Sequence, residues 1–120
     1  MATYSKITLN GGTDNGRLIK VAATATAGTT IHTGPAAGII DELWLYAVNS
    51  SASTVKLTIE FGGVSAPDDL IEFTVPAEDG LYLVVAGLLI KGNATALVVR
   101  AFAATANVVM IGGYVNRITA

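Results

Sequence analysis

The chain contains no cysteine, and this absence excludes several kinds of site. Disulfide bridges, thiolate metal centres and cysteine nucleophiles are all ruled out. Histidine is almost as scarce, because His32 is the only one among 120 residues. A metal site or a catalytic triad would therefore have to use this one imidazole or do without any.

Charged residues are also few. The chain has 7 basic and 9 acidic residues, 13% of the total, where an ordinary domain has about 25%. The net charge of −2 argues against electrostatic binding of nucleic acid, which needs a clear basic excess. Since 52% of the residues are hydrophobic, the composition also excludes a disordered chain.

Long apolar runs are missing. The longest, Leu81 to Ile90, has ten residues, about half of what a membrane-spanning helix needs. Residues Met1 to Leu9 are polar and lack the basic start and apolar core of a signal peptide. We therefore expect no membrane partner, and synthesis in the cytoplasm.

What the sequence does contain is strand periodicity. In Ser53 to Phe61, apolar residues alternate with polar ones over eight positions, which predicts a strand with one buried and one wet face. Leu70 to Val75 repeats the pattern. Further strands are predicted at Lys20–Thr26, Thr29–Thr33, Ile39–Asn49, Leu81–Ile90, Ala96–Phe102 and Val108–Tyr114, the last two joined as a hairpin around Ala104–Asn107.

This pattern predicts one all-β domain. About eight strands separated by Gly, Pro and Asn turns, with no helix, favour a two-sheet antiparallel β-sandwich, jelly-roll-like, over residues 17–120. Residues 1–16 are the most polar stretch and carry two turn signals, Asn10-Gly11-Gly12 and Asp14-Asn15-Gly16. They are expected to form a short strand followed by a loop, or an arm that orders only against a partner.

The C-terminal third breaks the sandwich pattern. Its three predicted strands are apolar on both faces, and from Leu81 to Ala120 the only charges are Lys91, Arg100 and Arg117. Soluble monomers rarely expose apolar patches above a few hundred Å², so we expect a homo-oligomer, most simply a trimer, to cover this surface. The alternative is that small Ala and Gly residues keep the patch modest. The expected interface residues are the anchors Trp44, Tyr46 and Tyr82 and the apolar Leu88, Val98, Phe102 and Val109.

Catalytic motifs are weak. Ser65 could complete a triad with His32 and an aspartate, but Gly63–Pro67 lacks the closing glycine and the helix of a nucleophile elbow. The acidic pairs Asp41-Glu42, Asp68-Asp69 and Glu78-Asp79 are interpreted as loop and turn residues, with calcium at Asp68 and Asp69 as the alternative. Trp44, Tyr46 and Tyr82 are interpreted as core or interface residues rather than as a sugar-stacking platform. We expect no enzyme, no cofactor and no resident metal.

Three stretches carry a family resemblance. They are Ala103–Ile118, which ends in Gly-Tyr-Val-Asn-Arg-Ile, the opening Ala2–Ile7, and Leu57–Gly63. These stretches resemble small virion proteins of tailed bacteriophages. The resemblance implies a structural role without catalytic residues. Proteins of this type bind the junctions between major capsid proteins, often as trimers, and clamp the shell.

The sequence therefore predicts a capsid decoration (cement) protein on the virion surface, whose partners are the major capsid protein and further copies of itself. The alternative is a tail or fibre component that binds a receptor or carbohydrate. A small hydrolase is a third hypothesis, and it would require His32 near a serine and a carboxylate.

Overall fold

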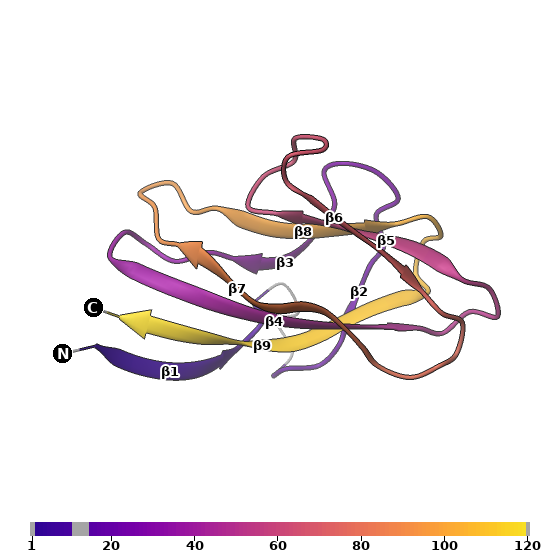
Figure 1. Ribbon diagram of the computed structural model, residues 1–120, viewed down its shortest axis with the longest axis horizontal. Helices are drawn as coiled ribbons and strands as arrows, with labels where there is room; N and C mark the ends of the chain where they lie inside the picture. The colour runs from indigo at the N-terminus through magenta and orange to yellow at the C-terminus, as the bar shows by residue number, and fades with distance from the viewer. Residues whose placement is uncertain (1, 11–14, 120) are drawn as a thin grey trace.

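The computed structural model describes residues 2–10 and 15–119, in which nine β-strands and no helix occur (Figure 1). One sheet, called sheet A, has the strand order β1 (Thr3–Thr8), β9 (Val109–Thr119), β4 (Ile39–Asn49), β7 (Tyr82–Lys91), with β2 (Ile19–Lys20) also paired to β9. The other, sheet B, has the order β3 (Thr29–Thr33), β8 (Val98–Ala103), β5 (Val55–Phe61), β6 (Leu70–Val75). Every pairing is antiparallel, so the prediction of an all-β, two-sheet antiparallel sandwich is confirmed.

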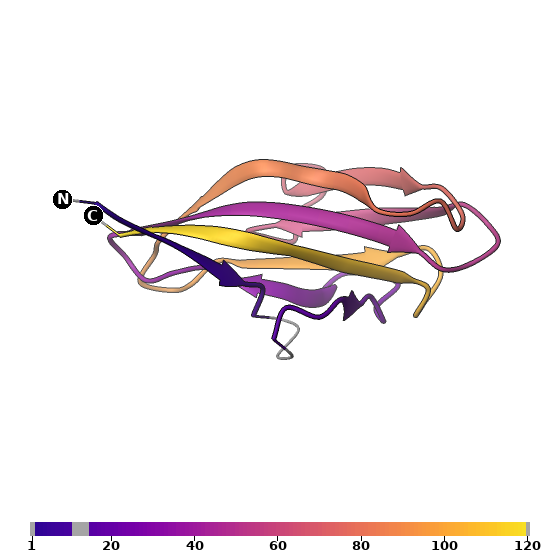
Figure 2. The same cartoon turned by 90° about the horizontal axis from the view of Figure 1, so that it is seen from below.

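The two sheets face each other across one apolar core (Figure 2). In β4 the odd-numbered positions from Asp41 to Asn49 are buried and the even-numbered ones are half-buried, as alternation requires for a sheet with one covered face. The fully buried Leu43 and Leu45 meet Leu57 and Ile59, which are equally buried on β5. The molecule is elongated, 48 × 27 × 22 Å, and β1 begins at the end where β9 finishes.

The pairing is nested along the chain. Without the short β2, the first strand pairs with the last (β1 with β9), and the following pairs are β3 with β8, β4 with β7 and β5 with β6. Most connections therefore cross from one sheet to the other. The predicted hairpin around Ala104–Asn107 is wrong, because β8 and β9 belong to different sheets and this turn bridges the sandwich.

Two predicted boundaries differ from the structure. Of the expected strand Lys20–Thr26, only Lys20 belongs to a strand, β2. Residues 21–28 run as an irregular segment beside sheet B. This segment hydrogen-bonds to β8 and β5 instead of forming a ladder, as when Ala103 N donates to the carbonyl of Ala23. In the polar N-terminal stretch, residues 3–8 form β1, which pairs with β9 over six residues. Residues 11–14 of that stretch lie outside the described part of the chain.

Strand β7 is an edge strand of sheet A with two irregularities. Its register with β4 shifts between Leu43 and Trp44 and again between Leu45 and Tyr46. Gly87 lies at the first shift with φ +77°, and an added Cβ there would be 3.0 Å from the Trp44 ring. Bulges of this kind twist an edge and interrupt its row of free backbone groups.

Candidate functional site

The three predicted anchors do not form one group. Trp44 and Tyr46 are half-buried on the outer face of sheet A, two residues apart on β4. Tyr82 lies on β7, where its ring packs against Phe73 of sheet B at 6.1 Å and its hydroxyl donates to Asp79. This hydrogen bond raises the pKa of Tyr82 above its ordinary value. A flat platform of all three rings is therefore absent.

The four apolar interface candidates are also separated. Leu88 is 45% exposed on β7. Val98 and Phe102 are half-buried on β8, which lies inside sheet B between β3 and β5. Val109 is completely buried in the core of the single chain, so it has no surface to offer a partner. The apolar character of β8 and β9 is thus largely explained by their central positions, each with a strand on both sides.

The exposed apolar surface gathers instead on β7 and the residue before it. Leu81, Leu83, Leu88 and Leu89 have exposed fractions of 44% to 58%. Leu88 lies opposite the core residue Leu43 in the ladder, so we call only Leu81, Leu83 and Leu89 the β7 leucine surface. Leu83 and Leu89 lie opposite Tyr46 and Glu42 in the ladder, which places both on the outer face of sheet A. No charged residue occurs from Leu81 to Ile90. Among the described strands, β7 pairs only with β4, so this surface borders an open edge.

A polar and aromatic group lies elsewhere on the same outer face. We call Lys6, Glu42, Trp44, Tyr114 and Asn116 the outer-face cluster. Trp44 Nε1 and Asn116 Nδ2 both donate to Glu42 Oε1, at 2.7 and 2.8 Å. These hydrogen bonds hold the pKa of Glu42 below its ordinary value. The Trp44 and Tyr114 rings stack with centroids 6.2 Å apart, and the Lys6 ammonium lies 4.9 Å from the Tyr114 centroid.

This cluster results from the register in which β1, β9 and β4 pair. Lys6 pairs with Asn116 and Asn116 pairs with Glu42, so the three strands β1, β9 and β4 place one polar row across the sheet. The next row along pairs Tyr114 with Trp44. Sequence analysis found Trp44 but missed its partners, because the pairing of β1 and β4 with the last strand is a long-range feature. Alternation within each segment was the only available signal.

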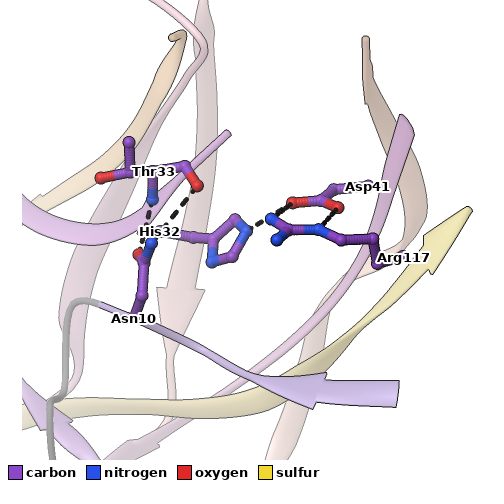
Figure 3. Close-up of polar contacts among 5 residues, drawn as sticks. All are labelled: Asn10, His32, Thr33, Asp41 and Arg117. Carbon is purple, nitrogen blue, oxygen red and sulfur yellow. Dashed lines mark hydrogen bonds and ion pairs between the residues drawn. The ribbon is translucent and has the colours of Figure 1, made fainter. Parts of the chain in front are cut away.

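Inside the sandwich, His32 of β3 meets Asp41 of β4 (Figure 3). Both side chains are completely buried, and His32 Nε2 is 2.7 Å from Asp41 Oδ2. Arg117 of β9 approaches the same carboxylate with two parallel hydrogen bonds of 2.8 Å, from Nε to Oδ1 and from Nη2 to Oδ2. The three residues thus connect the two sheets through a charge-assisted network.

The charges in this network follow from burial. Burial lowers the pKa of His32, and this effect outweighs the hydrogen bond and charge of Asp41, which raise it. For Asp41, burial raises the pKa, but hydrogen bonds from Arg117 and His32 prevail and lower it. Asp41 and Arg117 already form a neutral ion pair, so a protonated His32 would add a net buried charge. We therefore assign a neutral imidazole that donates from Nε2 and leaves Nδ1 as the acceptor; among the described residues, Nδ1 has no hydrogen-bond partner.

The position of Asp41 corrects one interpretation. The pair Asp41-Glu42 is not a turn but part of β4, with Asp41 inside the sandwich and Glu42 on the outer face. His32 is accordingly a buried, hydrogen-bonded residue of the core. The main chain next to it is held by Asn10, whose Oδ1 accepts from Thr33 N at 2.6 Å (Figure 3).

A second buried carboxylate, Glu60 of β5, lies on the outer side of sheet B. Alternation predicts this position to be wet, yet Glu60 is completely buried and Thr58 nearly so. Gly28 N donates to Glu60 Oε1 at 2.7 Å and the Thr26 hydroxyl donates to Oε2. The segment 21–28 therefore covers this part of the sheet, and it runs so close to β8 that a Cβ on Gly28 would lie 2.4 Å from the Ala101 carbonyl oxygen.

The remaining chemical candidates are not assembled into a site. The His32 nitrogen that a triad would use has no hydrogen-bond partner in the described part of the chain, which includes Ser65, so Ser65 does not engage it. Asp69 accepts a hydrogen bond from Ser65 N at 3.0 Å and so stabilises its own loop. Within residues 2–10 and 15–119, no three His, Asp or Glu side chains are grouped so that they could hold a metal ion. The same residues include no helix able to cross a membrane.

Comparison with known proteins adds no assignment: no protein-family model, no curated protein and no solved structure matches this chain.

Proposed function

We propose that this protein is a non-catalytic structural component of a virion, a capsid decoration protein that associates with copies of itself and with the major capsid protein. The observation that carries the proposal is the β7 leucine surface, an apolar surface at one open edge of sheet A. Fully burying an exposed leucine side chain contributes about 1.5–3 kcal/mol. The three leucines of this surface are already about half covered, so their burial can contribute about 2–5 kcal/mol to a contact.

The two bulges of β7 indicate how such a contact forms. A regular edge strand can extend a neighbouring sheet through its backbone, but bulges disrupt that ladder. We therefore propose that the leucine side chains pack against a second copy of the chain, without continuous pairing of backbones. A closed ring, most simply a trimer, would let each copy present the same surface and leave other faces free for the shell.

The nested pairing supports a finer description of the fold, a jelly roll. Pairing of the first strand with the last, then inward along the chain, is what a long hairpin produces when it rolls up into two sheets. Jelly rolls are found in viral capsid and lectin domains. Fold alone does not establish function, so this likeness supports the proposal without carrying it.

The first test is the solution mass of the purified chain by size-exclusion chromatography with light scattering. We expect a stable multiple of 12.3 kDa, three being the simplest. The double variant L83E/L89E should run as a monomer with an unchanged circular-dichroism spectrum. The matched control is Leu18→Glu, because Leu18 is similarly exposed, at 52%, but lies at β2 beside β9. A monomeric wild-type chain would overturn the self-association part.

The second test addresses the shell. The genes beside that of this chain are first searched for a major capsid protein; empty expanded shells of that protein are then assembled, and binding is followed by co-sedimentation. We expect saturable binding in a fixed ratio to capsid subunits and a higher melting temperature of the decorated shell. Lack of binding to those shells, or the absence of any capsid gene in the neighbourhood, would overturn the decoration proposal and favour a tail or fibre component.

A further inference from the structure

The outer face of sheet A contains a pocket of about 360 Å³, within the usual size range of ligand sites. It is lined by residues of three strands: Tyr4, Ser5 and Lys6 of β1, Glu42 of β4, and Asn116 and Ile118 of β9. Its polar groups belong to the outer-face cluster. The β7 leucine surface contributes nothing to it, so this pocket is a separate feature from the proposed oligomer interface.

The polar groups of the pocket are held in place before any ligand arrives. Within the described residues, both hydrogen bonds to Glu42 fall on Oε1, from Trp44 and Asn116, so Oε2 is free to accept from a ligand. Lys6 is oriented by its position over the Tyr114 ring. All the groups stand on paired strands, which are more rigid supports than loops.

Tyr4 and Ile118 form the apolar walls of the pocket, beside its polar groups. Tyr4 is 72% exposed and pairs with Ile118 in the β1–β9 ladder, one row beyond Lys6 and Asn116. The pocket thus offers an exposed aromatic ring next to an acceptor, an amide and an ammonium donor. An aromatic ring favours contact with the apolar C–H face of a ring-shaped ligand, and the polar groups fix its orientation.

The charge of the pocket restricts the class of ligand. Among the described residues that line it, Lys6 and Glu42 are the only charged ones, and their charges cancel. A phosphate or a polyanion would meet the fixed carboxylate of Glu42 and be repelled. A neutral ligand with neighbouring hydroxyl groups fits better, because each hydroxyl both donates and accepts. One hydroxyl can donate to Glu42 Oε2 while its neighbour accepts from Lys6 or Asn116.

We propose that this pocket binds a neutral sugar: one pyranose ring packs its C–H face on Tyr4 and Ile118, and its hydroxyl groups hydrogen-bond to Glu42, Lys6 and Asn116. This function goes beyond capsid decoration and does not depend on it. A protein attached to a particle in many copies would bind surface glycans through many weak contacts acting together.

The single tryptophan provides a local reporter. Trp44 donates to Glu42, so the ¹H–¹⁵N signal of its indole should respond when a ligand engages that carboxylate. We would titrate the ¹⁵N-labelled full chain separately with glucose, galactose, N-acetylglucosamine and rhamnose. At least one sugar should give saturable shifts in the millimolar range for the Trp44 indole and for the backbone amides of residues 4–6 and 116–118.

Two variants test the contacts. Lys6→Ala and Glu42→Gln should each weaken binding of that sugar about tenfold, because each removes a charge-assisted hydrogen bond. The matched control is Glu72→Gln, an exposed carboxylate on sheet B that pairs with Lys56, and it should bind like the wild type. All three variants should have the same solution mass as the wild type. Conversely, the self-association variant L83E/L89E should still show the sugar-induced shifts.

Three outcomes would overturn the proposal. One is the absence of saturable shifts with all four sugars. Another is wild-type affinity in both Lys6→Ala and Glu42→Gln. The third is a set of shifts that maps to β7 instead of β1 and β9. A failure of self-association or shell binding leaves these readouts untouched, so the two proposals fail independently.

Discussion

Strands β4 and β5 occupy corresponding places in the two sheets, and each carries a completely buried carboxylate. On β4, Asp41 points into the sandwich, where Arg117 and His32 bind it. On β5, Glu60 points away from the core and is covered by the segment 21–28. The first carboxylate is buried by the sandwich itself, and the second by a stretch of chain laid over the outside.

The two carboxylates therefore stabilise different parts of the structure. Asp41 links sheet A to sheet B through His32, and its charge is balanced by Arg117. Glu60 accepts from two uncharged donors, the Gly28 N–H and the Thr26 hydroxyl, and so anchors an irregular segment to sheet B. An opposite charge is available near Glu60 on its cross-strand neighbour Arg100, which donates to Thr30.

The largest effect is expected from Asp41→Asn. This variant leaves the Arg117 guanidinium without its counter-ion and weakens the contact with His32, so we expect a loss of about 3 kcal/mol in the free energy of unfolding. Urea denaturation monitored by Trp44 fluorescence would measure it. The neighbouring Glu42→Gln is the matched control and should cost much less, because Glu42 lies on the outer face. Equal losses would break the distinction between inner and outer carboxylates.

A somewhat smaller effect is expected from Glu60→Ala. The Gly28 N–H and the Thr26 hydroxyl lose their acceptor, which should cost about 2 kcal/mol. Amide hydrogen exchange should accelerate in residues 22–28 more than in β5. The control Glu72→Ala, on the neighbouring strand β6, should change stability by less than about 0.5 kcal/mol, since its pair with Lys56 is exposed. Uniform acceleration across the protein would show that Glu60 supports the whole fold.

Removal of residues 2–8 should have a modest effect. The side chains of β1 are exposed apart from the half-buried Ile7, and β9 lies between β1 and the Asp41 carboxylate. We expect a cooperative melting transition to persist, with a loss of about 1 kcal/mol from the burial of Ile7. Sugar binding should disappear with Tyr4 and Lys6. Loss of the cooperative transition would mean that β1 is integral to the fold and is not a dispensable edge.

The two carboxylates also show what the sequence could predict. Alternation correctly placed Leu57 and Ile59 inside the sandwich, since that pattern is local. It also put Glu60 on the opposite face of β5. Alternation says nothing about what covers a face, so the burial of Glu60 could not be predicted. The covering segment was itself predicted as a strand over Lys20–Thr26, because its threonines and alanines do not reveal that it lacks a ladder.

The network around Asp41 was missed for a different reason. Its members are 9 and 76 positions from Asp41 in the chain, and only the pairing of β4 with β9 in sheet A brings Arg117 close. The predicted strand Ile39–Asn49 agrees with β4 in both boundaries, yet Asp41 was interpreted as a solubilising turn residue. The signal that was available is that Asp41 shares the face of Leu43 and Leu45, since a charge among core positions requires a buried partner elsewhere in the chain.

The free energy of unfolding is also expected to depend on pH. Burial lowers the pKa of His32 below 6.5, so below that pH the unfolded chain binds a proton that the folded chain does not. Protons then favour the unfolded state. The histidine contribution is therefore fully present above pH 6.5 and declines on acidification, by at most about 1.4 kcal/mol per pH unit for one proton. The lowered pKa of Asp41 adds a further loss only as the pH falls below about 3.8.

Urea midpoints measured between pH 5 and pH 8 would reveal this dependence, and His32→Gln supplies the control. Glutamine keeps an amide donor for Asp41 but cannot titrate, so its stability should change less over this range than that of the wild type. If the profiles of His32→Gln and the wild type are parallel, then the buried imidazole is not what couples the two sheets to pH.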